Sequence, residues 1–236
     1  MSASTHSGAG KAKRPRFFFA AVAFLFALGF LGARPAGGPR IQSREAPPKI
    51  CRYLTWEWNT RTRTSVNHRW VEKSFGEVTG EEMDPASRCS VCEADQITIE
   101  LEGLPEFRVC KYFAGKVKAA LLEIRESGFP LRTVTGYRVG RTRGKPDAKG
   151  LRTRFSNHSF GTAIDLNAGL NGMYSNCVVF GEACRLIRGG HWRPPNPGTL
   201  TADSIPVAAL KAIGWKWGGE IAGRQKDFMH FSLSGY

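Results

Sequence analysis

Two short segments, far apart in the chain, each contain a histidine and an aspartate. They constrain the possible folds more than any other feature of the sequence. The first is S-N-H-S-F-G-T-A-I-D at residues 156–165, and the second is D-F-M-H-F at residues 227–231. Asp165 lies between Ile164 and Leu166, and a carboxylate in an apolar strand needs a cation or several donors to offset its lost hydration. Two imidazoles and one carboxylate are the donor set of a catalytic zinc site that leaves one coordination position for water. We therefore expect a fold that brings the two segments together.

The two histidines in these segments are among only five in the chain. A single histidine beside aromatic residues is usually a hydrogen-bonded structural residue. His158 and His230, however, each have an aspartate at a fixed offset. We expect both histidines on apolar-flanked strands.

The N-terminal region predicts export from the cytoplasm. A basic segment at residues 1–16 precedes an uncharged, apolar run at residues 17–33. Such a pair engages the secretion machinery and leaves the basic flank in the cytoplasm. We expect residues 17–33 to be retained as a single membrane anchor, with a cleaved signal peptide as the alternative, since their length is at the lower limit for spanning a bilayer. A Pro/Gly-rich tether follows at residues 34–50.

The cysteine content agrees with an extracytoplasmic location at the periplasm or cell surface. An exported chain with an even number of cysteines favours disulfides. Cys177 and Cys184 are close enough in sequence to close a local loop, which leaves the other four to pair in the N-terminal half. A four-cysteine zinc site is the competing interpretation of those four. The six cysteines are Cys51, Cys89, Cys92, Cys110, Cys177 and Cys184.

The chain is basic, with 34 Lys and Arg against 20 Asp and Glu and a formal net charge of +14. The positive residues lack the aromatic interleaving of a single-strand binder, and no DNA-reading helix is recognisable, so we expect no nucleic-acid partner. Outside the membrane, a basic surface suits anionic polymers such as peptidoglycan. A solvated charged face without a partner is the alternative.

The hydrophobic pattern predicts an α+β fold with a small antiparallel or mixed sheet, flanking helices and a single zinc site. Apolar residues at helical spacing predict a helix from Phe113 to Ile124, and a second, short helix is expected at residues 206–213. Strands are expected at residues 132–137, 162–167 and 229–233. We expect residues 51–110 to form a Cys-containing extension pinned by disulfides, and residues 111–236 to form the catalytic domain. The long insertion at residues 171–198 is expected to shape a cleft.

Four motifs between Tyr112 and Leu233, roughly half of the chain, carry a family resemblance. S-x-H-x-x-G-x-A-x-D and D-x-M-H-F, with T-G-Y-R at residues 135–138 and W-K-W-G-G at residues 215–219, resemble a family of zinc peptidases. This family includes D-alanyl-D-alanine carboxypeptidases, D-Ala-D-Ala dipeptidases and the L-alanyl-D-glutamate endopeptidases of phage lysins.

The resemblance implies a zinc ion held by His158, Asp165 and His230. It also implies that Asp227 is the catalytic base and that Arg138 holds a substrate carboxylate or stabilises the developing oxyanion. The carboxypeptidase and dipeptidase branches commonly carry Glu-x-x-His, whereas this chain has Asp227 three residues before His230. This departure favours the L-alanyl-D-glutamate branch.

Three further residues of these motifs are candidates for binding substrate beside Arg138. Tyr137 precedes Arg138, and Ser156 begins the first histidine motif, where it could orient the site. Trp217 could line the cleft, although core packing is the competing interpretation because Trp215 and Trp217 would share one face of a short strand.

Together with the histidine motifs, the family resemblance implies a zinc-dependent peptidase acting on peptidoglycan stem peptides. Cleavage of the L-Ala-D-Glu bond or of the D-Ala-D-Ala bond is expected. The alternatives are a non-catalytic, metal-containing module that binds the cell wall, and a structural envelope protein that relies on its disulfides and holds no metal.

Overall fold

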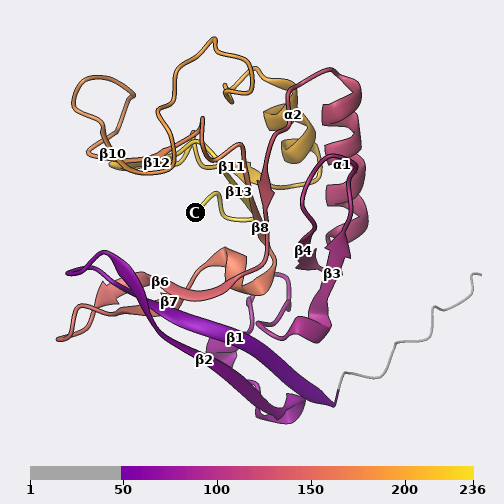
Figure 1. Cartoon of the computed structure of the whole chain (residues 1–236), viewed down its shortest axis with the longest axis vertical. Coiled ribbons are helices and arrows are strands. Elements are labelled where there is room, and N and C mark those ends of the chain that lie inside the picture. The colour runs from indigo at the N-terminus through magenta and orange to yellow at the C-terminus, as the bar shows by residue number, and fades with distance from the viewer. Residues whose placement is uncertain (1–48) are drawn as a thin grey trace, which may run out of the picture. The chain divides into compact units, whose positions relative to one another are not determined.

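The computed structural model describes residues 49–236, which belong to the same structural unit (Figure 1). The basic segment predicted at residues 1–16, the anchor or signal predicted at residues 17–33 and almost all of the tether predicted at residues 34–50 lie outside the described residues. From residue 49 onward, no helix combines the length and the apolar character needed to cross a membrane.

The described residues form an α+β fold, as the sequence predicts, but with four sheets rather than one. One of these sheets is mixed and has the strand order β2-β1-β6-β7. Its β1–β2 and β6–β7 pairs are antiparallel, whereas β1 and β6 run parallel. The first two strands belong to the predicted Cys-containing extension, so this sheet joins the extension to the segment that carries the histidine motifs. The strands are β1 (Ile50–Asn59), β2 (Thr64–Ser74), β6 (Val139–Pro146) and β7 (Arg152–Phe155).

An antiparallel sheet with the order β11-β13-β8-β5 brings the two histidine motifs together. Strand β8 carries Asp165 and pairs with β13, which carries His230. The bounds of β8 and of β13 each lie within one residue of those expected from sequence. The strand expected at residues 132–137, in contrast, is reduced to the two residues of β5. The strands are β5 (Val134–Thr135), β8 (Ala163–Leu166), β11 (Lys216–Trp217) and β13 (His230–Ser232).

Two smaller sheets complete the strand inventory of the described residues. The order β10-β9-β12 forms a three-stranded antiparallel sheet, in which β9 and β10 come from the predicted insertion. The pair β3–β4 is also antiparallel. The strands are β3 (Gln96–Ile99), β4 (Phe107–Cys110), β9 (Met173–Ser175), β10 (Arg185–Arg188) and β12 (Gln225–Asp227).

Two helices, α1 (Ala114–Glu126) and α2 (Ile205–Ala212), share one apolar core with the histidine-bearing sheet. Val117, Leu121 and Ile124 of α1 are fully buried, which matches the helical spacing seen in the sequence. They belong to the same cluster as Ile164 of β8 and Phe231 of β13. The strands that bear the site residues are therefore backed by the main core.

Disulfides and a second apolar cluster connect the N-terminal part to the rest of the unit. Cys51 bonds to Cys92, and Cys89 bonds to Cys110, so the four-cysteine zinc interpretation is wrong. The cluster around these bonds also contains Val139 of β6. The chain between residues 51 and 110 thus contributes to the same folded unit as the histidine motifs.

Short 3-10 turns at residues 75–77, 80–82 and 93–95 link these elements, and one of them buries Glu82. Tyr53 donates a hydrogen bond to Glu82, Lys73 donates at 2.6 Å and the backbone N–H of Thr79 donates at 2.8 Å. Burial by itself would raise the pKa of Glu82, but the hydrogen bonds from Lys73 and Tyr53 outweigh it and hold the pKa at about 2. This carboxylate fixes β1 and β2 to the turn beneath them.

Candidate active site

Strand register brings the two predicted motif segments to one point. In the β8–β13 pair, His230 lies directly opposite Asp165. Directly paired residues of an antiparallel sheet project from the same face, so the two side chains meet although the chain between them is long. Both side chains are buried.

His158 reaches the same point from a short 3-10 helix, η4 (Asn157–Phe160), rather than from a strand as predicted. Gly161 ends this turn with φ of 65°, in the left-handed region, and the chain then enters β8. The prediction of a strand is wrong because the turn needed to reverse the chain before β8 occupies the residues around His158.

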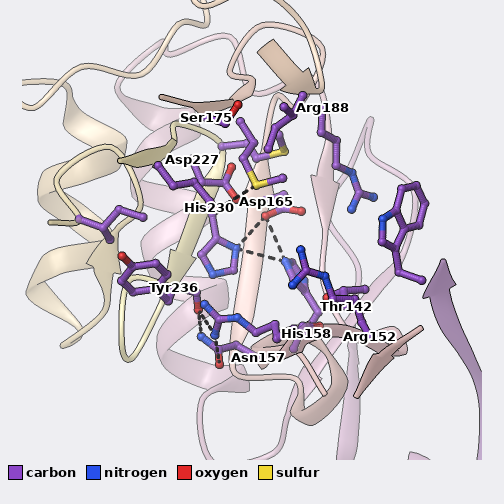
Figure 2. A pocket seen from close by; sticks show the side chains of 18 of the residues that line it. Thr142, Arg152, Asn157, His158, Asp165, Ser175, Arg188, Asp227, His230 and Tyr236 are labelled. Atoms are coloured by element: carbon purple, nitrogen blue, oxygen red, sulfur yellow. Dashed lines mark hydrogen bonds and ion pairs between the residues drawn. The ribbon is translucent and has the colours of Figure 1, made fainter. Parts of the chain in front are cut away.

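The three side chains form a tight triangle of possible metal ligands (Figure 2). His158 Nε2 lies 3.1 Å from Asp165 Oδ1 and 3.2 Å from His230 Nδ1, and His230 Nδ1 lies 3.0 Å from Asp165 Oδ1. Tetrahedral zinc with ligands at about 2.0 Å separates neighbouring donor atoms by roughly 3.3 Å. The triangle therefore fits one face of a zinc coordination shell.

The hydrogen bond at Nδ1 of His158 also favours a bound cation. His158 Nδ1 lies 2.9 Å from the carbonyl oxygen of Gly136, so this nitrogen carries the proton and Nε2 presents a lone pair. Burial lowers the pKa of His158 to about 4, although Asp165 opposes the shift. A neutral imidazole then directs a lone pair at a carboxylate oxygen, an arrangement that a cation between them would stabilise.

The pKa values of Asp165 and His230, the other two members of the triangle, shift in opposite directions. Burial by itself would raise the pKa of Asp165, but His158 and His230 outweigh it and keep that pKa well below its ordinary value. Burial opposes protonation of His230, but its hydrogen bond to Asp165 raises its pKa. Asp165 therefore presents a carboxylate to the position between the two rings.

Arg138 supports the triangle from the opposite side of Asp165. Its Nη2 lies 3.0 Å from Asp165 Oδ2, while Oδ1 of the same carboxylate faces the histidines. The backbone N–H of Arg138 donates to the carbonyl of His158 at 3.1 Å. Burial lowers the pKa of Arg138 and Asp165 raises it in part, but a guanidinium remains charged. Its buried Nε has no hydrogen-bond partner among the described residues.

Asp227 lines the same cavity at the end of β12. Residues 228 and 229 then form a turn before β13 begins at His230, so the chain changes sheets between the two side chains. Asp227 Oδ1 is buried and has no hydrogen-bond partner within residues 49–236. Burial raises the pKa of Asp227 to about 6, opposed by His230 and assisted by Asp165. A carboxylate in this state can accept a proton near neutral pH.

These residues line one cavity of about 800 Å³. It contains the triangle, Asp227, Arg138 and Ser156. Ser156 Oγ lies 3.4 Å from Ser159 Oγ, and no hydrogen bond joins Ser156 directly to the triangle. The insertion supplies part of the wall through β9 and β10, as expected. A disulfide between Cys177 and Cys184 closes the loop between these two strands.

Two residues expected to bind substrate do not line this cavity. Tyr137 points away from it, and its hydroxyl donates to the carbonyl of Val91 at 2.6 Å. Because neighbouring residues in an extended segment project in opposite directions, only Arg138 of the two enters the site. Trp217 lies in the main core, where its indole N–H donates to the carbonyl of Phe228 at 2.8 Å, so the core-packing interpretation is the correct one.

The sequence argument missed most of the charged residues of the cavity wall. Arg143, Arg152, Arg185 and Arg188 all line it, as does Arg63 from the loop between β1 and β2. The basic stretch at residues 138–154 was visible in the sequence, but it gave no sign of which side chains face inward. The spacing R-L-I-R in β10 also does not show that both arginines face the cavity. In a regular strand, residues three apart face opposite sides, but a register shift between Leu186 and Arg188 changes this.

Residues 149–233 match the family model described as D-alanyl-D-alanine carboxypeptidase. The matched segment contains His158, Asp165, Asp227 and His230, and it supports the peptidase family inferred from the motifs. Arg138 and the sheet strands β1, β2 and β6 lie before it. No curated protein and no solved structure matches the chain.

Proposed function

We propose that this protein is a zinc-dependent peptidase that hydrolyses the stem peptides of peptidoglycan. The observation that carries the proposal is the buried triangle of His158, Asp165 and His230 beside the unpartnered carboxylate of Asp227. A structural zinc site needs ligands but has no use for an unsatisfied carboxylate in the same cavity. The match of residues 149–233 to a carboxypeptidase family model supports the same class of reaction.

Each side chain has a role that its surroundings support. His158, Asp165 and His230 would hold the metal, which when bound would lower the pKa of a water molecule and polarise the scissile carbonyl. Asp227 would act as the general base, accepting a proton at its unpartnered Oδ1 and passing it to the leaving amine. Arg138 keeps Asp165 oriented through Nη2 and offers its unpartnered Nε–H to the oxygen that becomes negative.

We favour the L-alanyl-D-glutamate endopeptidase type over the D-alanyl-D-alanine carboxypeptidase type. The base in this chain is an aspartate three residues before the histidine, where the carboxypeptidase branch commonly has glutamate. The shorter side chain is accommodated because the turn at residues 228–229 brings Asp227 to the cavity that also holds His230. The identity of the released fragments distinguishes the two types directly.

The cellular location follows from the same set of features. Three disulfides support an oxidising, extracytoplasmic compartment, and a cell-wall peptidase finds its substrate there. We propose that residues 17–33 anchor the protein in the membrane, with the described unit on the outer side of that membrane.

The test is digestion of purified muropeptides by the full chain loaded with zinc, with the products identified by mass spectrometry. Wild type should release fragments cut at one stem-peptide bond. Asp227→Asn keeps the shape of the side chain but removes the proton acceptor, so hydrolysis should fall by about 100-fold or more at unchanged zinc content. Asp203→Asn alters an exposed aspartate outside the cavity and should leave the rate unchanged.

The possible outcomes separate the candidate functions. Wild type that binds peptidoglycan without releasing any fragment would make the protein a wall-binding module. Hydrolysis that survives in Asp227→Asn would assign the base to another group. Loss of zinc in that variant would make Asp227 a ligand and would reopen the role of Asp165.

A further inference from the structure

The wall of the cavity carries far more positive than negative charge. Six arginines line it against two aspartates, and its described lining includes neither lysine nor glutamate. Arg138 is paired with Asp165, but the other five have no aspartate or glutamate within ion-pair distance among residues 49–236. The five are Arg63, Arg143, Arg152, Arg185 and Arg188. Like charges that converge in a concave site repel one another, and an anionic ligand relieves that repulsion.

Two of these arginines project from β10 in register with the proposed base. Arg188 pairs with Met173 of β9, and Met173 pairs on its other side with Asp227 of β12. Direct antiparallel partners face the same side of a sheet, so these three side chains form one row on the cavity face. With strands about 4.8 Å apart, the backbone of Arg188 lies roughly 10 Å from that of Asp227. We call Arg185 and Arg188 the β10 arginine pair.

Arg185 belongs to the next row of the same face. It pairs with Ser175 of β9, which pairs on its other side with Gln225 of β12, and all three line the cavity. Both arginines of the pair are exposed, and neither side chain has a hydrogen bond or an ion pair to another described residue. The β10 arginine pair therefore presents two guanidinium groups to the cavity without competing protein acceptors.

Two further arginines stand on the β6–β7 hairpin, and oxygen acceptors hold both. Arg143 donates to the main-chain oxygen of Tyr236, the last residue of the sequence, at 3.1 Å and to Asn157 Oδ1 at 3.4 Å, and Arg152 donates to the carbonyl oxygen of Gly144. These acceptors orient the guanidinium groups, and neither group is paired with an aspartate or a glutamate of the described residues. We call Arg143 and Arg152 the β6–β7 arginine pair. Figure 2 shows Arg152 and Arg188 on different sides of the triangle.

We propose that the two arginine pairs bind two separate carboxylates of one extended peptide, so that the substrate is a peptide with at least two free carboxylates. The inference rests on the proposed function, because it assumes that the peptide lies across the triangle. A guanidinium is a planar fork that matches a carboxylate with two parallel hydrogen bonds. Each pair is therefore a specificity determinant that distinguishes a free carboxylate from its uncharged amide.

The probe is the peptide L-Ala-γ-D-Glu-L-Lys-D-Ala-D-Ala, which has one free carboxylate on its glutamate and one at its C-terminus. Four versions are compared, with each carboxylate either free or converted to the amide. Binding to the zinc-loaded Asp227→Asn chain, which should not cleave the peptide, is measured by calorimetry, and hydrolysis by the zinc-loaded wild-type chain is measured in parallel. Each amidation should weaken binding by about tenfold, which is the scale of one charged hydrogen-bonded contact. This effect of amidation should be smaller at high salt, because salt screens the attraction between guanidinium and carboxylate.

Variants assign each carboxylate to an arginine pair. Arg188→Gln should abolish the effect of amidating one carboxylate, and Arg143→Gln should abolish the effect of amidating the other. Arg143→Lys keeps the charge and should retain part of the discrimination, which guards against a folding defect in Arg143→Gln. Arg193→Gln, an exposed arginine outside the cavity, is the matched control and should behave as wild type.

The outcomes distinguish this inference from the proposed function. Hydrolysis that is indifferent to amidation would overturn the inference and leave the peptidase standing. Carboxylate-dependent binding without hydrolysis would support the arginine pairs and overturn the peptidase. Tighter binding of poly(glycerol phosphate), in competition with the free-acid peptide, would overturn the inference in favour of a phosphate polymer.

Discussion

Gly161→Ala tests how the fold positions His158. Gly161 has φ of 65°, and a Cβ added there would lie 1.9 Å from Gln96 Oε1 and 2.5 Å from the backbone nitrogen of Cys110. The Gln96 side chain can rotate away, but Cys110 is bonded to Cys89 and donates its N–H to the carbonyl of Gly161. The substitution should therefore displace the backbone that leads from η4 into β8.

The expected cost has two parts. A left-handed conformation costs an L-residue about 1–2 kcal/mol, and an overpacked site costs about 1–3 kcal/mol more. The total of about 2–5 kcal/mol corresponds, at roughly 2–4 °C per kcal/mol for a unit of this size, to a Tm lower by on the order of 5–15 °C. Zinc affinity should fall as well, because the displaced turn carries His158.

Two other glycines separate the backbone and packing contributions. Gly103 has φ of 77° with no atom within 4 Å of an added Cβ, so Gly103→Ala should cost only about 1 kcal/mol. Gly169 has open space and an ordinary φ, so Gly169→Ala should leave the Tm within about 2 °C of wild type or raise it. Thermal melts of the three variants and zinc content by elemental analysis provide the comparison. If Gly161→Ala melts no lower than Gly103→Ala, the argument from close backbone approach is refuted.

Three further predictions concern the metal, the disulfides and acid stability. His158→Ala should lose the zinc and lower the Tm, because metal binding is coupled to folding; full zinc occupancy in elemental analysis would contradict the assigned ligands. An oxidised preparation should contain no free thiol, with peptide mapping linking Cys177 to Cys184, and opening this loop should cost about 2–3 kcal/mol in urea unfolding. The folded-state pKa of Glu82 is about 2, below its ordinary value of 4.5, so its stabilising contribution is present above pH 4.5 and is lost as the pH falls toward 2. Glu82→Gln should therefore be less stable than wild type by about 2 kcal/mol at pH 7, and the difference should shrink at pH 3; an equal difference at both pH values would refute the assignment.

Local patterns in the sequence predicted the elements that carry the site but not its walls. The spacing of Val117, Leu121 and Ile124 predicted α1 because helical periodicity is a property of neighbouring residues. Asp165 between two apolar neighbours predicted a buried strand for the same reason. The strand predicted for His158 was wrong, because long-range hydrogen bonds hold that segment as a turn: the N–H of Cys110 donates to the carbonyl of Gly161, and the N–H of Arg138 donates to the carbonyl of His158.

Tyr137 and Trp217 show where motif position alone is insufficient. Each belongs to a motif that resembles one of a peptidase family. The Tyr137 hydroxyl nevertheless donates to the carbonyl of Val91, and the Trp217 ring packs in the core. The direction of a side chain depends on which face of its strand is covered, and distant parts of the chain supply that cover. The arginines of β10 illustrate the same point, because their inward direction follows from the pairing of β10 with β9.

By itself, the sequence determined the chemistry available to this protein: two histidines with nearby aspartates, cysteines suited to three disulfides and a surplus of arginine. Tertiary structure decided how that chemistry is arranged. The β8–β13 register places Asp165 opposite His230, and the change of sheet after Asp227 leaves its carboxylate unpartnered beside them. The pairing of β10, β9 and β12 places two exposed arginines along the wall of the same cavity. Register between strands distant in sequence depends on long-range packing and hydrogen bonding, which no local pattern of residues encodes.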